Sequence, residues 1–141
     1  MKRTRKKNIP SFILLDDDVF ALTFTKEIIR SCNRRAEIIT FSTAKDAIEY
    51  MRTEDFMCKR TDTVFLTDLH MPEIDGFALL DRMENQFKAM RERLHVFVLS
   101  AAACSEEILR VTSYSCVIGF INKPFSIEKL EQIIECIKYP L

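Results

Sequence analysis

Apolar runs of strand length alternate with segments of helical periodicity along most of the chain. A short run of consecutive apolar residues that ends at polar or turn-forming residues is typical of a parallel strand buried on both faces. The alternation therefore predicts βαβ units and one parallel sheet with helices on both faces. The five expected strands cover residues 11–15, 37–41, 64–68, 95–99 and 117–121.

The first expected helix follows three adjacent acids at residues 16–18. Acidic side chains favour a helix N-terminus because they complement the positive end of the helix dipole, so Asp18 is interpreted as the helix start. Apolar residues then recur at every fourth position, at Phe20, Phe24 and Ile28. This spacing predicts an amphipathic helix to about residue 31, with these side chains on its apolar face.

Four further helices are expected. One begins at Ser42 or Thr43 and extends to about Met51, and another begins near Ser105, before two acids that favour a helix start. The last helix is capped by Ser126. Two of the helices are predicted from apolar residues at helical spacing: Leu80, Met83, Phe87 and Met90 in one, and Ile127, Leu130, Ile134 and Ile137 in the last.

No linker or internal repeat divides the chain, so the pattern predicts one domain over residues 11–139. Residues 52–62 are polar and poorly periodic, and are interpreted as a loop or a frayed helix extension. Residues 1–10 form a basic N-terminal arm, which is expected to be disordered. The arm holds five of the 21 Lys and Arg residues, so 16 basic and 21 acidic residues remain, a net charge of −5. A domain with this charge and no basic stripe is not expected to bind nucleic acid directly.

The amino-acid composition narrows the class of protein further. Hydrophobic residues make up 48% of the chain and charged residues 30%, which fits a globular protein. No apolar stretch is long enough to span a membrane. The five cysteines are an odd number without a C-x-x-C pair, which favours free thiols in a reducing cytoplasm. The cysteines and the two histidines are too scattered to predict a zinc site.

Polar residues stand at four of the expected strand ends: Asp16 with Asp17, Asp68, Ser100 and Lys123. A parallel sheet brings the carboxyl ends of its strands to one edge, where open α/β folds bind ligands. Crowded carboxylates need countercharge, which Lys123 supplies in part. A hard divalent cation with oxygen ligands, Mg²⁺, would supply the rest, and its open coordination positions suit a phosphoryl group. Asp68 is the candidate nucleophile, since carboxylates form acyl phosphates.

Four stretches at these strand ends are Leu15-Asp16-Asp17-Asp18, Thr67-Asp68-Leu69-His70-Met71-Pro72 with Gly76, Leu99-Ser100-Ala101-Ala102, and Gly119-Phe120-Ile121-Asn122-Lys123-Pro124-Phe125. In this order they closely resemble the receiver domain of bacterial two-component response regulators, the chemotaxis-regulator-like family. The resemblance extends from residue 11 to about 138. It implies a flavodoxin-like (βα)5 domain, a doubly wound five-stranded parallel sheet with strand order 2-1-3-4-5.

The resemblance also implies a phosphorylation site. Asp68 would be the phosphoacceptor and would receive a phosphoryl group from a phosphohistidine. Mg²⁺ would be the cofactor. Its ligands would be Asp17 and Asp68 through their side chains, His70 through its backbone carbonyl, and Asp16 through water.

Three more residues would bind the phosphoryl group or report its presence. Ser100 would hydrogen-bond a phosphoryl oxygen, and Lys123 would pair with Asp68 or with the phosphoryl group. Phe120 matches the family's switch aromatic, and without a hydroxyl it would act by packing alone. Packing in the core is a rival interpretation of Phe120. The resemblance also suggests a cis peptide bond before Pro124.

The implied function is a signalling switch in a phosphorelay, without an attached output domain. Its partners would be a sensor histidine kinase or a histidine phosphotransfer protein, and a downstream protein bound through about residues 105–138. Receiver homodimers often use the same surface. The domain would not be an enzyme, beyond catalysing its own phosphorylation and dephosphorylation.

Other functions remain as alternatives. A receiver-like docking module without phosphorylation is the main one, although degenerate receivers usually lose an acidic position or the lysine. The chain is also interpretable as a receiver cut from a larger protein. A phosphatase of the haloacid-dehalogenase type would need a second aspartate at position 70, which is His70 here.

Overall fold

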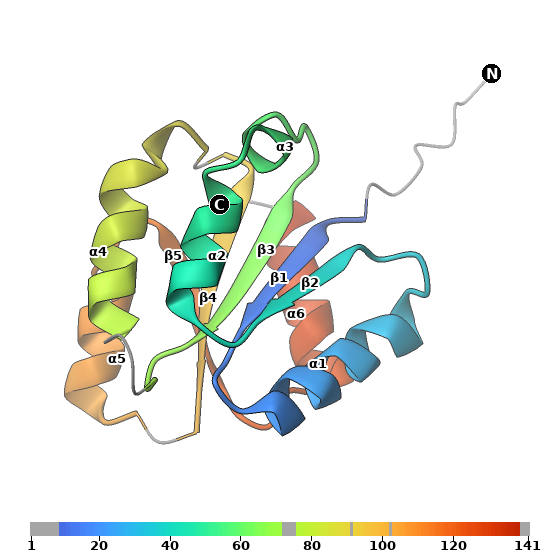
Figure 1. Ribbon diagram of the computed structural model, residues 1–141. Coiled ribbons are helices and arrows are strands. Elements are labelled where there is room, and N and C mark those ends of the chain that lie inside the picture. The colour runs from blue at the N-terminus through green and yellow to red at the C-terminus, as the bar shows by residue number, and fades with distance from the viewer. Residues whose placement is uncertain (1–8, 72–75, 91, 102, 139–141) are drawn as a thin grey trace.

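The computed structural model describes residues 9–71, 76–90, 92–101 and 103–138. Its five strands are β1 (Ser11–Leu15), β2 (Ile38–Phe41), β3 (Thr63–Asp68), β4 (Leu94–Ser100) and β5 (Val117–Asn122). They form one parallel sheet in the order β2-β1-β3-β4-β5 (Figure 1). The predicted fold class and strand order are confirmed.

Helices cover both faces of the sheet (Figure 1). One face packs against α1 (Val19–Cys32) and α6 (Ile127–Lys138). The other packs against α2 (Ala44–Met51), α3 (Glu54–Met57), α4 (Gly76–Gln86) and α5 (Ser105–Thr112). The sheet is therefore the middle layer of three.

An apolar core lies on each side of the sheet, because successive residues of a strand point to opposite faces. In β1, Ile13 and Leu15 contribute to the core beneath α2 to α5, whereas Phe12 and Leu14 contribute to the core beneath α1 and α6. Every residue of β1 and β3 is buried, as expected for central parallel strands. The two cores fix the ends of these strands and hence the polar residues that follow them.

Helix α1 buries a different face from the predicted one. Leu22, Thr25 and Ile29 are its buried residues, whereas Phe20 is 87% exposed and Phe24 is 49% exposed. The prediction that both phenylalanines belong to the inner face is wrong. Two stripes with helical spacing run along this helix, and the direction in which the helix crosses the sheet decides which stripe is buried.

Two local expectations are also corrected. The helix predicted to reach Met90 is interrupted: α4 ends before Phe87, and a 3-10 turn at Lys88–Met90 follows. Phe87 and Met90 are buried all the same, because residues three apart in a 3-10 turn share a face. Within residues 52–62, Thr53 caps the one-turn helix α3, which buries Phe56.

The predicted helix starts agree with the observed caps. The Oδ1 atom of Asp18 accepts hydrogen bonds from two N–H groups in the first turn of α1. The Thr43 hydroxyl accepts from the Asp46 N–H at 3.2 Å, and the Ser126 hydroxyl accepts from the Lys129 N–H at 3.2 Å. These bonds satisfy N–H groups that have no partner within the helix.

Helix α6 differs from its predicted face at one position. Leu130 and Ile133 are buried, and Ile134 and Ile137 pack partly buried against the same core. Ile127, expected on this face, is exposed. The first residue of the helix thus lies beyond the edge of the core.

Several predictions lie outside the described residues: most of the basic arm (1–8), the segment 72–75 that contains Pro72, Ala102, and the domain's last residue, 139. Strand β1 begins at Ser11, the expected start of the domain. In the described part of the chain, no helix has both the length and the apolar character needed to cross a bilayer.

Gly76 packs closely against the backbone at the end of β3. Its N–H donates to the Leu69 carbonyl at 3.2 Å, and a Cβ atom at position 76 would lie 2.4 Å from that oxygen. The contact is with backbone, so it cannot be relieved by a side-chain rotation. The glycine therefore allows the start of α4 to approach the strand that carries Asp68.

We expect Gly76→Ala to lower the free energy of unfolding by roughly 2–3 kcal/mol, because the added methyl group forces the backbone apart. Urea denaturation monitored by circular dichroism measures this change. The matched control is Gly119→Ala, where the new Cβ atom would lie 3.3 Å from the movable Phe97 ring. It should cost less than about 1 kcal/mol. Equal losses in the two variants would contradict this account.

Candidate functional site

The register of the strands brings the expected site residues to one edge of the sheet. Leu15 pairs with Thr67, so Asp16 and Asp68 come next on adjacent strands. Asp68 pairs with Leu99, the residue before Ser100. On the other side, Ser100 pairs with Asn122, which precedes Lys123. Residues far apart in the sequence thus meet at the carboxyl ends of four neighbouring strands.

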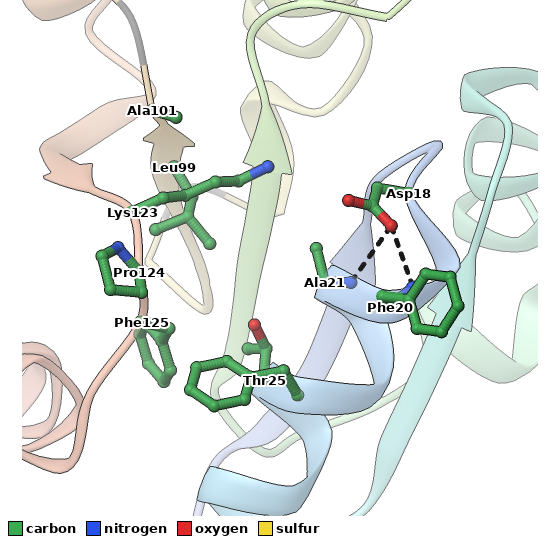
Figure 2. Close-up of a pocket in the computed structure, with 10 residues that line it drawn as sticks. Asp18, Phe20, Ala21, Thr25, Leu99, Ala101, Lys123, Pro124 and Phe125 are labelled. Atoms are coloured by element: carbon green, nitrogen blue, oxygen red, sulfur yellow. Dashed lines mark hydrogen bonds between the residues drawn. The ribbon is translucent and has the colours of Figure 1, made fainter.

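Lys123 bridges two buried carboxylates. Its Nζ atom donates to Oδ2 of Asp16 at 2.6 Å and lies 3.3 Å from Oδ2 of Asp68. Figure 2 shows the Lys123 side chain extended from the loop after β5 toward the end of β3. One ammonium group thus pairs with two carboxylates that lie at the ends of different strands.

The two carboxylates that Lys123 contacts belong to a cluster of three. One carboxylate oxygen from each of Asp16, Asp17 and Asp68 lies within 4.8 Å of the others. Asp16 and Asp68 are buried, whereas Asp17 is exposed. The Oδ1 atom of Asp16, which Lys123 does not bind, accepts the Asp18 N–H at 2.9 Å. A set of hard oxygen donors with one solvent-facing side fits a divalent cation such as Mg²⁺.

The environment shifts the pKa values of both partners in the buried pair. Burial raises the pKa of Asp68, and the nearby Asp16 charge adds to this effect, while Lys123 opposes it. Burial acts against the charged form of Lys123, but the bonds and charges of Asp16 and Asp68 outweigh it and raise the pKa of Lys123. Lys123 therefore stays protonated and supplies a fixed positive charge beside Asp68.

Ser100 ends β4, the strand next to that of Asp68, and Phe120 lies on β5, one strand further out. Ser100 is 1% exposed, and its carbonyl accepts the Lys123 N–H at 3.0 Å. Phe120 is half-buried and packs against the core beneath α2 to α5. Its roles as core residue and as switch residue are both compatible with this position. The peptide bond between Lys123 and Pro124 is cis, as expected.

His70 connects the site to helix α5. Its backbone N–H donates to Oδ1 of Asp68 at 3.3 Å, and its ring Nε2 lies 3.2 Å from Oε2 of Glu107. Glu107 also accepts the Cys104 N–H at the start of the helix, and this bond lowers the pKa of Glu107. From the sequence, Glu107 was predicted only as an acid at a helix start, because its contact with His70 depends on tertiary structure.

A pocket of about 450 Å³ opens beside Lys123, between α1 and the loop after β5 (Figure 2). Phe20 and Phe24 line it from α1, and Pro124 and Phe125 line it from the loop. This apolar rim was not predicted, because both phenylalanines were expected on the apolar face with which α1 packs against the sheet. Their place at the start of the helix, directly after the acids of the site, is the signal that could have identified them.

The sequence matches the family model described as the response regulator receiver domain over residues 12–135. The chain belongs to the response regulator receiver domain family. The matched region contains every residue of the site, and the predicted family is confirmed.

Named relatives agree with this assignment. The two-component response regulator ORR21 of Oryza sativa subsp. indica is 26% identical over 121 residues, which are 86% of this chain and 16% of that protein. The receiver domain therefore spans about a sixth of the length of this relative. A response regulator receiver protein from Dyadobacter fermentans DSM 18053 superposes with a TM-score of 0.80 at 26% identity, covering 91% of this chain and 97% of that one.

A two-component response regulator from Cytophaga hutchinsonii shares the fold. Its crystal structure superposes with a TM-score of 0.83 at 23% identity and covers 94% of this chain and 98% of that one. The close match in length and shape shows that the receiver fold accounts for nearly the whole described chain.

The raised pKa of Asp68 predicts how stability changes with pH in the absence of divalent ions. The folded state holds the Asp68 proton more tightly than the unfolded chain, so stability falls as pH rises from the ordinary value of 3.8 through the folded pKa. Asp68→Asn removes this penalty. We expect the variant to melt at a higher temperature than the parent at pH 7 in EDTA.

The difference in melting temperature between Asp68→Asn and the parent should shrink as the pH falls below about 4, because Asp68 is then protonated in both the folded and the unfolded parent. Thermal melts of the two proteins across this pH range provide the measurement. A variant that melts below the parent at pH 7 would show that the bond to Lys123 outweighs burial.

Proposed function

We propose that this receiver domain is a phosphorylation-dependent switch in a two-component pathway, and that Asp68 accepts a phosphoryl group from a phosphohistidine. The observation that carries the proposal is the Lys123 ammonium group held between Asp16 and Asp68, within a cluster of three carboxylates. Membership of the receiver family supports it. The donor would be a sensor histidine kinase or a histidine phosphotransfer protein.

The acidic cluster would hold Mg²⁺. We assign Asp17 and Asp68 as side-chain ligands, the His70 carbonyl as a third ligand, and Asp16 as a ligand through water. Bound there, Mg²⁺ would neutralise the oxygens of Asp68 and of the phosphoryl group. The exposed Asp17 leaves this side of the cluster open to an incoming phosphodonor.

In the proposed transfer, a carboxylate oxygen of Asp68 forms a bond to phosphorus while the bond between phosphorus and the imidazole nitrogen breaks. The electrons of that bond return to the imidazole, and the product is an acyl phosphate. The transition state is loose, so the residues of the site contribute position and charge. Lys123 would donate to the transferred group, and Ser100 would hydrogen-bond one of its oxygens.

Phosphorylation would add about 1.5 to 2 negative charges at the tip of β3. Ser100 and Phe120 would respond on the two strands that follow, and Phe120 would do so by a change in packing. His70 offers a second route, through its contact with Glu107 on α5. Both routes lead to the surface formed by residues 105–138, which we propose as the binding site for the downstream protein.

The apolar rim of the pocket would receive the phosphodonor protein. Phe20 and Phe24 lie one helical turn apart and flank the opening beside Lys123. The rim lies beside Lys123, whose ammonium group is 3.3 Å from Asp68, so a protein that presents its histidine to Asp68 would have this apolar surface within reach. Exposed aromatic side chains of this kind favour a protein partner over a small-molecule donor alone.

The alternative is a receiver-like docking module that is not phosphorylated. Such a module has no need for Lys123 or for three crowded carboxylates, which cost stability when they are left without a ligand. The bonded arrangement of Lys123, Asp16 and Asp68 therefore favours the switch.

We expect the protein to gain one phosphoryl group when it is incubated with Mg²⁺ and acetyl phosphate, since a small acyl phosphate can reach Asp68 without a protein partner. Intact-mass spectrometry measures the adduct. Asp68→Asn should gain none, because the amide is not a nucleophile for phosphorus. An unmodified parent that keeps its fold would support the docking module, and an adduct on the Asn variant would place the phosphoacceptor elsewhere.

A further inference from the structure

The loop that carries Lys123 is held by a second lysine on helix α6. The Nζ atom of Lys129 donates to the carbonyl oxygen of Asn122 at 2.6 Å and to that of Pro124 at 2.8 Å. These two carbonyls belong to the residues directly before and after Lys123. A single ammonium group therefore binds the backbone on both sides of the residue whose side chain reaches Asp68.

A third bond completes the attachment of this segment. The Lys123 N–H donates to the Ser100 carbonyl at 3.0 Å, which ties the segment to β4. The backbone around Lys123 is thus fixed from β4 on one side and from α6 on the other. A lysine side chain is long and flexible, so the reach of its ammonium group depends on where its backbone is held.

Lys129 is itself well placed to act as an anchor. Its N–H donates to the Ser126 hydroxyl that caps α6, and the next residue, Leu130, is buried in the core. The start of the helix is therefore tied to the body of the domain. The ammonium group of Lys129 has three donors, and the two loop carbonyls take two of them.

We propose that Lys129 is a positioning residue, which holds the loop so that Lys123 meets Asp68 and the incoming phosphoryl group. This inference rests on the proposed function. The rival interpretation is a partly exposed lysine that only adds positive charge near the site. The two differ in what they change: positioning affects the rate at saturating phosphodonor, whereas charge alone affects how readily an anionic donor binds.

The test compares Lys129→Met, which keeps the stem but removes both donors and the charge, with Lys129→Arg, which keeps donors and charge. Lys138→Met is the matched control, because it removes one exposed lysine from the other end of the same helix. Phosphorylation by acetyl phosphate with Mg²⁺ is followed over a range of donor concentrations.

We expect Lys129→Met to lower the rate at saturating donor by about tenfold, since small displacements of a catalytic group have effects of this order or larger. The half-saturating donor concentration should change less than about twofold. Lys129→Arg should recover most of the rate, and Lys138→Met should match the parent. A parental rate for Lys129→Met, or a loss expressed only in the half-saturating concentration, would overturn the inference.

A second measurement does not depend on phosphorylation. ¹⁵N relaxation of the Lys123 amide should give an order parameter of about 0.85 in the parent and a clearly lower one in Lys129→Met. If the parent accepts no phosphoryl group, the proposed function fails and this measurement alone decides the role of Lys129. An unchanged Lys123 amide in Lys129→Met would then overturn the inference.

Discussion

The site depends on the compensation of buried negative charge. Three carboxylates converge at the edge of the sheet, and the ammonium group of Lys123 pairs with two of them, Asp16 and Asp68. The cluster therefore retains two uncompensated negative charges, which match the charge of one divalent cation. Asp16 and Asp68 are buried, and the loss of hydration, to which the Asp16 charge adds, raises the pKa of Asp68 although Lys123 opposes it. A site that is unfavourable when empty is suited to binding a cation and then a phosphoryl group.

The sheet and the loop after β5 position the charged groups of the site in different ways. Asp68 ends a central strand that is buried along its whole length, so its backbone is fixed by both cores. Lys123 lies in a loop at the edge of the sheet, where β4 and α6 hold its backbone through Ser100 and Lys129. The acids are thus positioned by the sheet, and the cation that balances them is positioned by the contacts around its loop.

The strands, and the edge of the sheet at which the polar residues meet, could be predicted from the sequence. Consecutive apolar residues and acids at strand ends are local signals. The buried face of α1 could not be predicted from the sequence. The stripe with Phe20 and the stripe with Leu22 both have helical spacing, and only tertiary packing selects between them. Lys129 was missed for a similar reason. A lysine on the polar side of a helix has the same local pattern whether it faces solvent or binds loop carbonyls. The switch role of Phe120 stays a prediction, since packing in one state does not reveal a change between two.

Whether the acids form one cation site around Asp68 is measured by isothermal titration calorimetry with Mg²⁺. We expect one Mg²⁺ per chain, bound more weakly by Asp17→Asn by about tenfold or more. The adjacent Asp18→Asn should bind as the parent does, because Asp18 caps α1 and asparagine is an equally good cap. Equal Mg²⁺ affinity in the parent and in Asp17→Asn, or no binding to the parent, would show that these acids do not form a cation site.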